Sequence, residues 1–310
     1  MAANNTTGPA VVVAAPLGGR AAFDTAKRFL RTKPLGTAGA IILVLMVVAA
    51  LFAPSISPHD PYLIRQDKLF IAPFSSAEFF LGTDDMGRDL ASRLIYGARI
   101  SLYVGLVSTL LGSVVGAFLG LVGGYWGGRI DNIIQRFMDM LLAFPMLVLA
   151  MAVVVSLGPS LNNVILAIAL VMLPRSARVV RSSTLSIKEM LYVTAAKAIG
   201  CSNWRITLRH VLPQCLSPFI ILVTAQLGGA ILIEASLSFL GLGVPPPEPS
   251  WGAMLTGAAR FYVYKAPWMA LLPGVAISLA VFGFNLFGDA VRDILDPRLR
   301  EERRKGSRLS

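Results

Sequence analysis

The stretch ISLYVGLVSTLLGSVVGAFLGLV, residues 100–122, contains no charged side chain. A helix that crosses the hydrocarbon core of a bilayer needs about 20 such residues. Gly112, Gly116 and Gly120 recur every fourth position, so they lie on one helical face and leave a groove of small residues there. We expect a membrane-spanning helix that packs closely against another helix. A groove lining a path across the membrane is the alternative.

Five further apolar runs accompany this one, and together they predict an all-α membrane protein with six transmembrane helices. The chain has 310 residues, of which 55% are hydrophobic and only 15% charged, well below the share in soluble domains. The fourth run is short and should gain length from residues 174–180, while Pro145 and Pro273 should bend the third and sixth spans. The other runs are 35–53, 137–157, 161–173, 216–237 and 268–287.

The distribution of lysine and arginine predicts the orientation. With the N-terminus in the cytoplasm, 21 of the 28 basic residues fall in cytoplasmic segments and 7 in external ones, as the positive-inside rule requires. Both termini are then cytoplasmic. The expected division is a partly disordered N-terminal tail (1–34), a six-helix domain (35–290) with an external loop (54–99) and cytoplasmic helices (187–213), and a C-terminal tail (291–310).

Several classes of function are disfavoured. The net charge of +11 is explained by membrane orientation better than by nucleic-acid binding. The two histidines, His59 and His210, are expected on opposite sides of the membrane, and Cys201 and Cys215 lack a paired-cysteine spacing, so no metal site or cofactor is expected. No phosphate-binding glycine loop and no hydrolase or metalloprotease motif occurs, so the chain is not expected to be an enzyme or to bind ATP.

One segment expected in the cytoplasm has the pattern of two short helices that meet at a glycine: YVTAAKAIGCSNWRITLRHVLP, residues 192–213. Helix formers precede Gly200, which is placed to end a helix in a left-handed conformation, and Ser202 can cap a second helix that Pro213 should stop. The small pair Ala195 and Ala196 offers a shallow surface for a partner. On physical grounds alone, an amphipathic connector lying on anionic lipid fits about as well.

The segment resembles the cytoplasmic coupling loop of permease subunits from binding-protein-dependent ABC importers. That pattern reads Glu-Ala-Ala, three residues, Gly, nine residues, Ile, one residue, Leu-Pro. The matching positions are Ala195, Ala196, Gly200, Leu212 and Pro213. Thr194 replaces the glutamate and His210 the isoleucine; with Arg209, these departures resemble the peptide/nickel branch of the family.

Other segments extend the resemblance over residues 81–298 and are closest to the "C" subunit of the dipeptide/oligopeptide/nickel permeases. They are LGTDDMGRD (81–89), SRLIYGARISL (92–102), LSFLGLG (237–243), PSWG (249–252), NLFGD (285–289) and RDILDPR (292–298). The resemblance implies a type I ABC importer permease in a bacterial inner membrane. It also implies a homologous permease partner, two ATPase subunits and a soluble substrate-binding protein, with short peptides as cargo and nickel complexes or other small polar solutes as alternatives. Residues 195, 196, 200, 209, 210, 212 and 213 would carry the contact with the ATPase.

Placing a polar group inside a membrane span costs free energy, so such a group indicates either a functional role or a contact between helices. Gln226 and Glu234 are possible pathway residues, and a hydrogen bond between helices is the competing interpretation of Glu234. In the external segment, Thr83 or Asp84 should cap a helix that runs to about Ala98, and the neighbouring acidic residues lack the spacing of a calcium loop.

Two other classes of protein fit the sequence less well. A membrane-embedded enzyme would need convergent catalytic side chains, and the spans offer few. A secondary transporter normally carries internal repeats, and none is visible in the sequence. The sequence therefore favours a transport subunit.

Overall fold

A computed structural model describes residues 33–257 and 262–295. The first half of the chain forms α2 (Pro34–Leu51), α3 (Ala53–Ile56), α4 (Leu90–Trp126), α5 (Gly128–Leu142), α6 (Met146–Leu157) and α7 (Leu161–Lys188). The second half forms α8 (Leu191–Ala198), α9 (Asn203–Ile206), the π-helix η1 (Thr207–Val211), α10 (Leu212–Phe239), α11 (Trp251–Gly257) and α12 (Trp268–Leu295). Most of the predicted tail 1–34, and the part of the predicted C-terminal tail beyond residue 295, lie outside the described residues.

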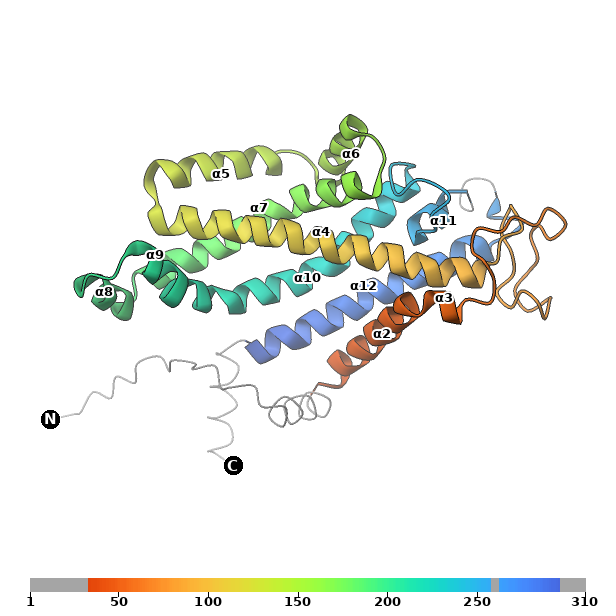
Figure 1. Cartoon of the computed structure of the whole chain (residues 1–310), viewed down its shortest axis with the longest axis horizontal. Coiled ribbons are helices and arrows are strands. Elements are labelled where there is room, and N and C mark those ends of the chain that lie inside the picture. Colours follow the sequence, from red (N-terminus) through yellow and green to blue (C-terminus); the bar gives the residue numbers. More distant parts are fainter. Residues whose placement is uncertain (1–32, 258–261, 296–310) are drawn as a thin grey trace, which may run out of the picture.

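The long helices run lengthwise beside one another (Figure 1). The connection between α3 and α4 gathers with α11 at one end of the bundle, here called the α11 end. The α8 and α9 helices project at the opposite end, here called the α8 end. The fold therefore separates two regions that a partner or a solute could contact.

The glycine row of α4 forms the close contact with α7, here called the α4–α7 seam. A Cβ atom at Gly112, Gly116 or Gly120 would overlap a backbone carbonyl of α7, those of Ala169, Leu173 and Ala177 respectively. The backbones of α4 and α7 therefore approach closely along more than two turns, as small residues permit. This confirms close packing as the role of the glycine row.

Five described helices are long and apolar enough to cross a membrane, and the α5–α6 pair raises the number to six if it counts as one span. The third span was expected to be one helix bent at Pro145. It is instead divided into two helices, α5 and α6, whose axes meet at 93°. Phe144 precedes Pro145, which disfavours helical backbone at Phe144 and supplies no N–H. By contrast, Pro174 and Pro273 lie inside the continuous helices α7 and α12.

The structure corrects the expected start of a helix at Thr83 or Asp84. The helix begins at Leu90, and the side chain of Asp89 accepts a hydrogen bond from the Ser92 N–H. It then continues without a break to Trp126, so the predicted external helix and the second span are one element. Asp84 instead closes a turn, accepting hydrogen bonds of 2.9 Å from the N–H groups of Met86 and Arg88.

Pro213 does not stop the second cytoplasmic helix, contrary to expectation. The chain passes from α9 through the π-helical turn η1 into α10, so that residues 203–239 form one continuous span. Pro213 is the second residue of α10 and follows directly on the π-helical turn η1. The α8 end is therefore joined rigidly to the interior of the bundle.

Candidate functional site

The α8–α9 hairpin is closed by a glycine turn. Gly200 has φ +81°, the left-handed conformation predicted for it. Its N–H donates to the Lys197 carbonyl, and the Cys201 N–H donates to the Ala196 carbonyl, which is the Schellman arrangement. The Ser202 hydroxyl then accepts a hydrogen bond from the Arg205 N–H, which confirms its role as an N-cap. Both helices are thus held at a fixed turn.

Apolar side chains point outward from this hairpin. Leu191 is 87% exposed and Ile199 81% exposed, with Trp204 and Leu208 more than half exposed. Leu191, Ala195 and Ala198 lie on one side of α8, and all three are exposed. The chain therefore presents an uncovered apolar surface at the α8 end, which we call the tip.

The other face of the hairpin is anchored in the bundle. Val193, Ala196, Ile206 and Val211 are buried in one cluster with residues of α4, α7 and α10. A hydrogen bond adds to this packing. The Tyr125 hydroxyl at the end of α4 donates to the Asn203 Oδ1 at 3.1 Å. The tip is therefore an ordered surface with a firm base.

The predicted coupling residues divide between the two faces. Ala195, Gly200 and Arg209 are exposed, whereas Ala196 is buried. His210 is half-buried, with its ring 6.4 Å from that of Tyr192. Leu212 and Pro213 lie at the junction with α10 rather than on the tip.

The two possible pathway residues are buried and engaged between helices. Glu234 on α10 accepts hydrogen bonds from Ser101 on α4 at 3.1 Å and from Ser238 at 2.8 Å. Gln226 Nε2 lies within 3.1 Å of the hydroxyls of Ser113 on α4 and Ser176 on α7. Both side chains therefore serve helix contacts, the competing interpretation of Glu234.

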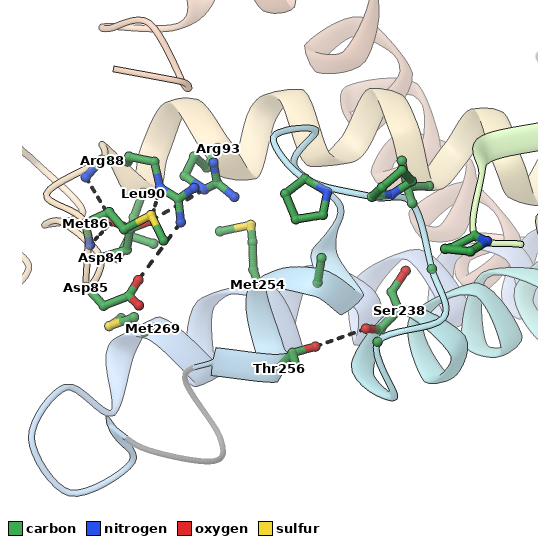
Figure 2. Close-up of a pocket in the computed structure, with 17 residues that line it drawn as sticks. Asp84, Asp85, Met86, Arg88, Leu90, Arg93, Ser238, Met254, Thr256 and Met269 are labelled. Carbon is green, nitrogen blue, oxygen red and sulfur yellow. Dashed lines mark hydrogen bonds and ion pairs between the residues drawn. The ribbon is translucent and has the colours of Figure 1, made fainter. Parts of the chain in front are cut away.

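A pocket of about 410 Å³ opens at the α11 end (Figure 2). Its apolar wall includes Met254 and Met269, and its polar wall is the turn before α4. In this turn Asp84 pairs with Arg88 at 2.7 Å and with Arg93 at 3.7 Å. Asp89, four residues before Arg93, is instead occupied by its capping of α4.

One carboxyl of the pocket is electrostatically unusual. Burial, and then the neighbouring Asp84, raise the pKa of Asp85 above its usual range. Asp85 lines the pocket with an arginine 4.0 Å away. A solute with a positive charge would favour the ionised form of this carboxyl.

Two ion pairs that the sequence did not predict join α5 to α7. Asp131 pairs with Arg181 through two contacts of 2.6 Å, and Asp139 pairs with Arg178 at 2.6 Å. Neither aspartate pairs with Arg136 of its own helix, because α7 brings its own arginines alongside α5. A row of arginines at three-residue spacing, 175, 178 and 181, was the available signal.

No group of three His, Cys, Asp or Glu side chains suited to a metal ion occurs within residues 33–257 and 262–295. Cys201 and Cys215 are free thiols, and Cys215 is buried.

Comparison with known proteins assigns this architecture. Residues 74–301 match the binding-protein-dependent transport system inner membrane component, and residues 23–78 match the N-terminal transmembrane domain of oligopeptide transport permease C. The chain is 44% identical over 271 residues to the dipeptide transport system permease protein DppC of Alkalihalophilus pseudofirmus, covering 87% of this chain and 88% of the relative. It is also 45% identical over 266 residues to the di/tripeptide transport system permease protein DppC of Pseudomonas aeruginosa. That alignment covers 84% of this chain and 88% of the relative.

The fold has a solved counterpart. An inward-facing structure of the MetNI methionine ABC transporter matches with a TM-score of 0.53 at 20% identity, over 66% of this chain and 96% of that chain. The all-helical bundle is thus the type I ABC importer permease fold expected from the sequence. The chain belongs to the family of inner membrane permease components of binding-protein-dependent transport systems.

Proposed function

We propose that this chain is a permease subunit of an ATP-driven importer for short peptides. It forms part of the translocation path together with a homologous permease, two ATPase subunits and a soluble binding protein. The cargo assignment is supported by relatives named as dipeptide and di/tripeptide transport permeases.

The observation that supports the coupling role is the exposed apolar tip, whose opposite face is packed into the bundle. Leu191 and Ile199 lie on it almost fully exposed, while Val193 and Ala196 anchor its other face. A surface of this kind suits a complementary groove on a protein partner. Because α9 continues through η1 into α10, a displacement of the tip would be passed along a continuous helix towards the α11 end.

The orientation follows from the basic residues. With the tip in the cytoplasm, it faces the ATPase subunits, and the pocket at the α11 end faces the binding protein. Both described chain ends, Lys33 and Leu295, then lie on the cytoplasmic side.

The test is co-purification and uptake with the complete transporter. The chain is co-expressed with its permease partner, the ATPases and the binding protein, and ATP-dependent uptake of alanyl-alanine is measured in proteoliposomes. Ile199→Asp places a charge on the tip and should abolish ATPase co-purification and uptake. Val263→Asp, a matched change at a 43% exposed position at the opposite end, should leave ATPase co-purification intact.

Equal ATPase recovery with Ile199→Asp and the wild type would contradict the coupling role of the tip. Uptake that continues without ATP or without the ATPase subunits would contradict the importer mechanism itself.

A further inference from the structure

Side chains from three helices meet where α4 ends. The ring centre of Trp126, the last residue of α4, lies 5.2 Å from that of Trp204 on α9 and 5.0 Å from that of Tyr125. The Nζ of Lys197, in the last turn of α8, lies 5.8 Å from the centre of the Tyr125 ring. We call these four side chains the aromatic corner. Trp204 is 56% exposed, so the corner is packed on one side and open on the other.

The surroundings of the aromatic corner are basic. Arg205 lies in α9, and Arg129 is the second residue of α5. Both arginines and Lys197 are exposed, and none of the three makes an ion pair in the part of the chain that the structure describes. Glu189 is the only acidic residue between positions 188 and 213. The corner therefore combines aromatic rings with positive charge that no carboxylate neutralises, a surface complementary to an anionic partner.

The length of α4 places the corner at the level of lipid headgroups. Residues 100–126 are helical and uncharged, and the nearest charges on either side are Arg99 and Arg129. At 1.5 Å per residue these 27 residues extend about 40 Å, close to the 40–45 Å of a bilayer with both headgroup layers. In the orientation proposed above, Trp126 then lies in the inner headgroup layer, where tryptophan rings are enriched.

The aromatic corner is separate from the part of the tip that carries Leu191 and Ile199. Figure 1 shows α9 beside the last turn of α4, whereas α8 extends beyond it. The hydrogen bond from the Tyr125 hydroxyl to Asn203 holds the start of α9 at this level. Leu191 and Ile199 can therefore contact a protein partner while Trp204 contacts the membrane.

We propose that the aromatic corner binds anionic phospholipid of the cytoplasmic leaflet. The tryptophan rings lie at the headgroup level, and Lys197, Arg205 and Arg129 contact the phosphate groups. The inference goes beyond the proposed function and uses only its orientation. Arginine forms paired hydrogen bonds with phosphate oxygens, and basic side chains next to a membrane are attracted to its anionic lipids. Such a contact holds the α9 side of the hairpin at a fixed height and leaves α8 to the ATPase.

The test measures the contact of Trp204 with lipid in the complete transporter. The complex is reconstituted in phosphatidylcholine vesicles with increasing fractions of phosphatidylglycerol whose acyl chains are brominated near the headgroup, because bromine quenches tryptophan fluorescence on contact. A parallel titration uses brominated phosphatidylcholine. The fluorescence lost in Trp204→Phe defines the signal of Trp204. We expect brominated phosphatidylglycerol to quench this signal at a lower fraction than brominated phosphatidylcholine does.

Removing one positive charge should weaken only the anionic contact. Arg205→Gln should raise the fraction of brominated phosphatidylglycerol at half-quenching about fivefold, the contribution of one basic side chain near a membrane surface. Quenching by brominated phosphatidylcholine should not change, and Arg205→Lys should restore most of the difference. Arg99→Gln is the matched control, because it removes an exposed arginine at the other end of the uncharged stretch of α4.

Equal quenching of the Trp204 signal by the two brominated lipids would show contact without selectivity for anions and would overturn the inference. Absence of quenching by either lipid would assign Trp204 to a contact with the ATPase or the partner permease, and would also overturn it. ATP-dependent uptake is measured in the same vesicles. Because uptake by the wild type tests the proposed function separately, either quenching result can fail the inference while the proposed function stands.

Discussion

Glu234 on α10 accepts a hydrogen bond of 3.1 Å from Ser101 on α4, and both side chains are fully buried. Ser101 in turn accepts from the backbone N–H of Trp251 at 3.4 Å, so the carboxylate is linked to the first turn of α11. Gly97 makes room for the Trp251 ring, and a Cβ at Gly252 would meet the backbone of Ala235.

A second chain of hydrogen bonds reaches the other carboxylate oxygen. The Ala253 N–H donates to Ser250, Ser250 donates to Ser238, and Ser238 donates to Glu234, over distances of 3.2, 3.3 and 2.8 Å. Each hydroxyl accepts from the α11 side and donates towards the carboxylate. The two chains fasten α11, one wall of the pocket, to α4 and α10.

Removing the carboxylate should loosen this connection. Glu234→Ala leaves the donors of Ser101 and Ser238 without their acceptor and should cost about 1–3 kcal/mol of stability, while Glu234→Gln keeps an acceptor and should cost less. Thermal unfolding of the purified complex in detergent measures the effect. Ser236→Ala is the control, because Ser236 is partly exposed and bonds only within its own helix. Equal melting temperatures for Glu234→Ala and Ser236→Ala would contradict this assignment.

The close approach of α4 and α7 predicts intolerance to a single methyl group. Gly116→Ala places a Cβ against the Leu173 carbonyl and should destabilise the fold by about 1–3 kcal/mol, as overpacking does. Gly229→Ala, where nothing lies within 4 Å, should be neutral. Thermal unfolding of the two variants distinguishes them, and similar melting temperatures would show that the α4–α7 seam can relax.

The turn of the tip predicts a loss of coupling. Gly200→Val forces a β-branched residue to φ +81°, a strain on the order of 1–3 kcal/mol, and should reduce ATPase co-purification while the chain still inserts in the membrane. Gly158→Val is the matched control, since Gly158 has φ +87° and open space around it, but lies between α6 and α7. Full ATPase recovery with Gly200→Val, or equal loss in both variants, would refute the specific role of this turn.

The connection between α3 and α4 contains a tyrosine that should titrate late. Burial, and then the hydrogen bond of 3.0 Å to Glu248, raise the pKa of Tyr62 to about 12. Because the pKa is raised in the folded state, the stabilising contribution of this phenol is complete below pH 10 and is lost as the pH rises towards 12.

Ultraviolet titration of the tyrosines measures this directly. Tyr62→Phe should remove a phase near pH 12 and leave the earlier tyrosine phases unchanged. A titration curve that keeps its late phase in the variant would contradict the assignment to Tyr62. Glu248→Gln should move the phase towards lower pH, because it removes the neighbouring negative charge.

Much of this protein follows from local sequence. Apolar runs of sufficient length must form helices in a membrane, because backbone groups there have no water to bond with, and the glycine row of α4 fixed where α7 could approach. The turn at Gly200 and the cap at Ser202 are also local, since each depends on a backbone preference of one residue and on neighbours within a few positions.

The tertiary structure decided which residues of distant segments contact one another. Whether Asp139 pairs with Arg136 or Arg178, whether Glu234 faces a path or Ser101, and how far Pro145 turns the chain all depend on which helix lies alongside. The ion pair between Asp131 and Arg181 is the clearest case, because these residues are 50 positions apart and meet only once α5 packs beside α7. Sequence determines which helices form, and the packing between them determines which charges pair.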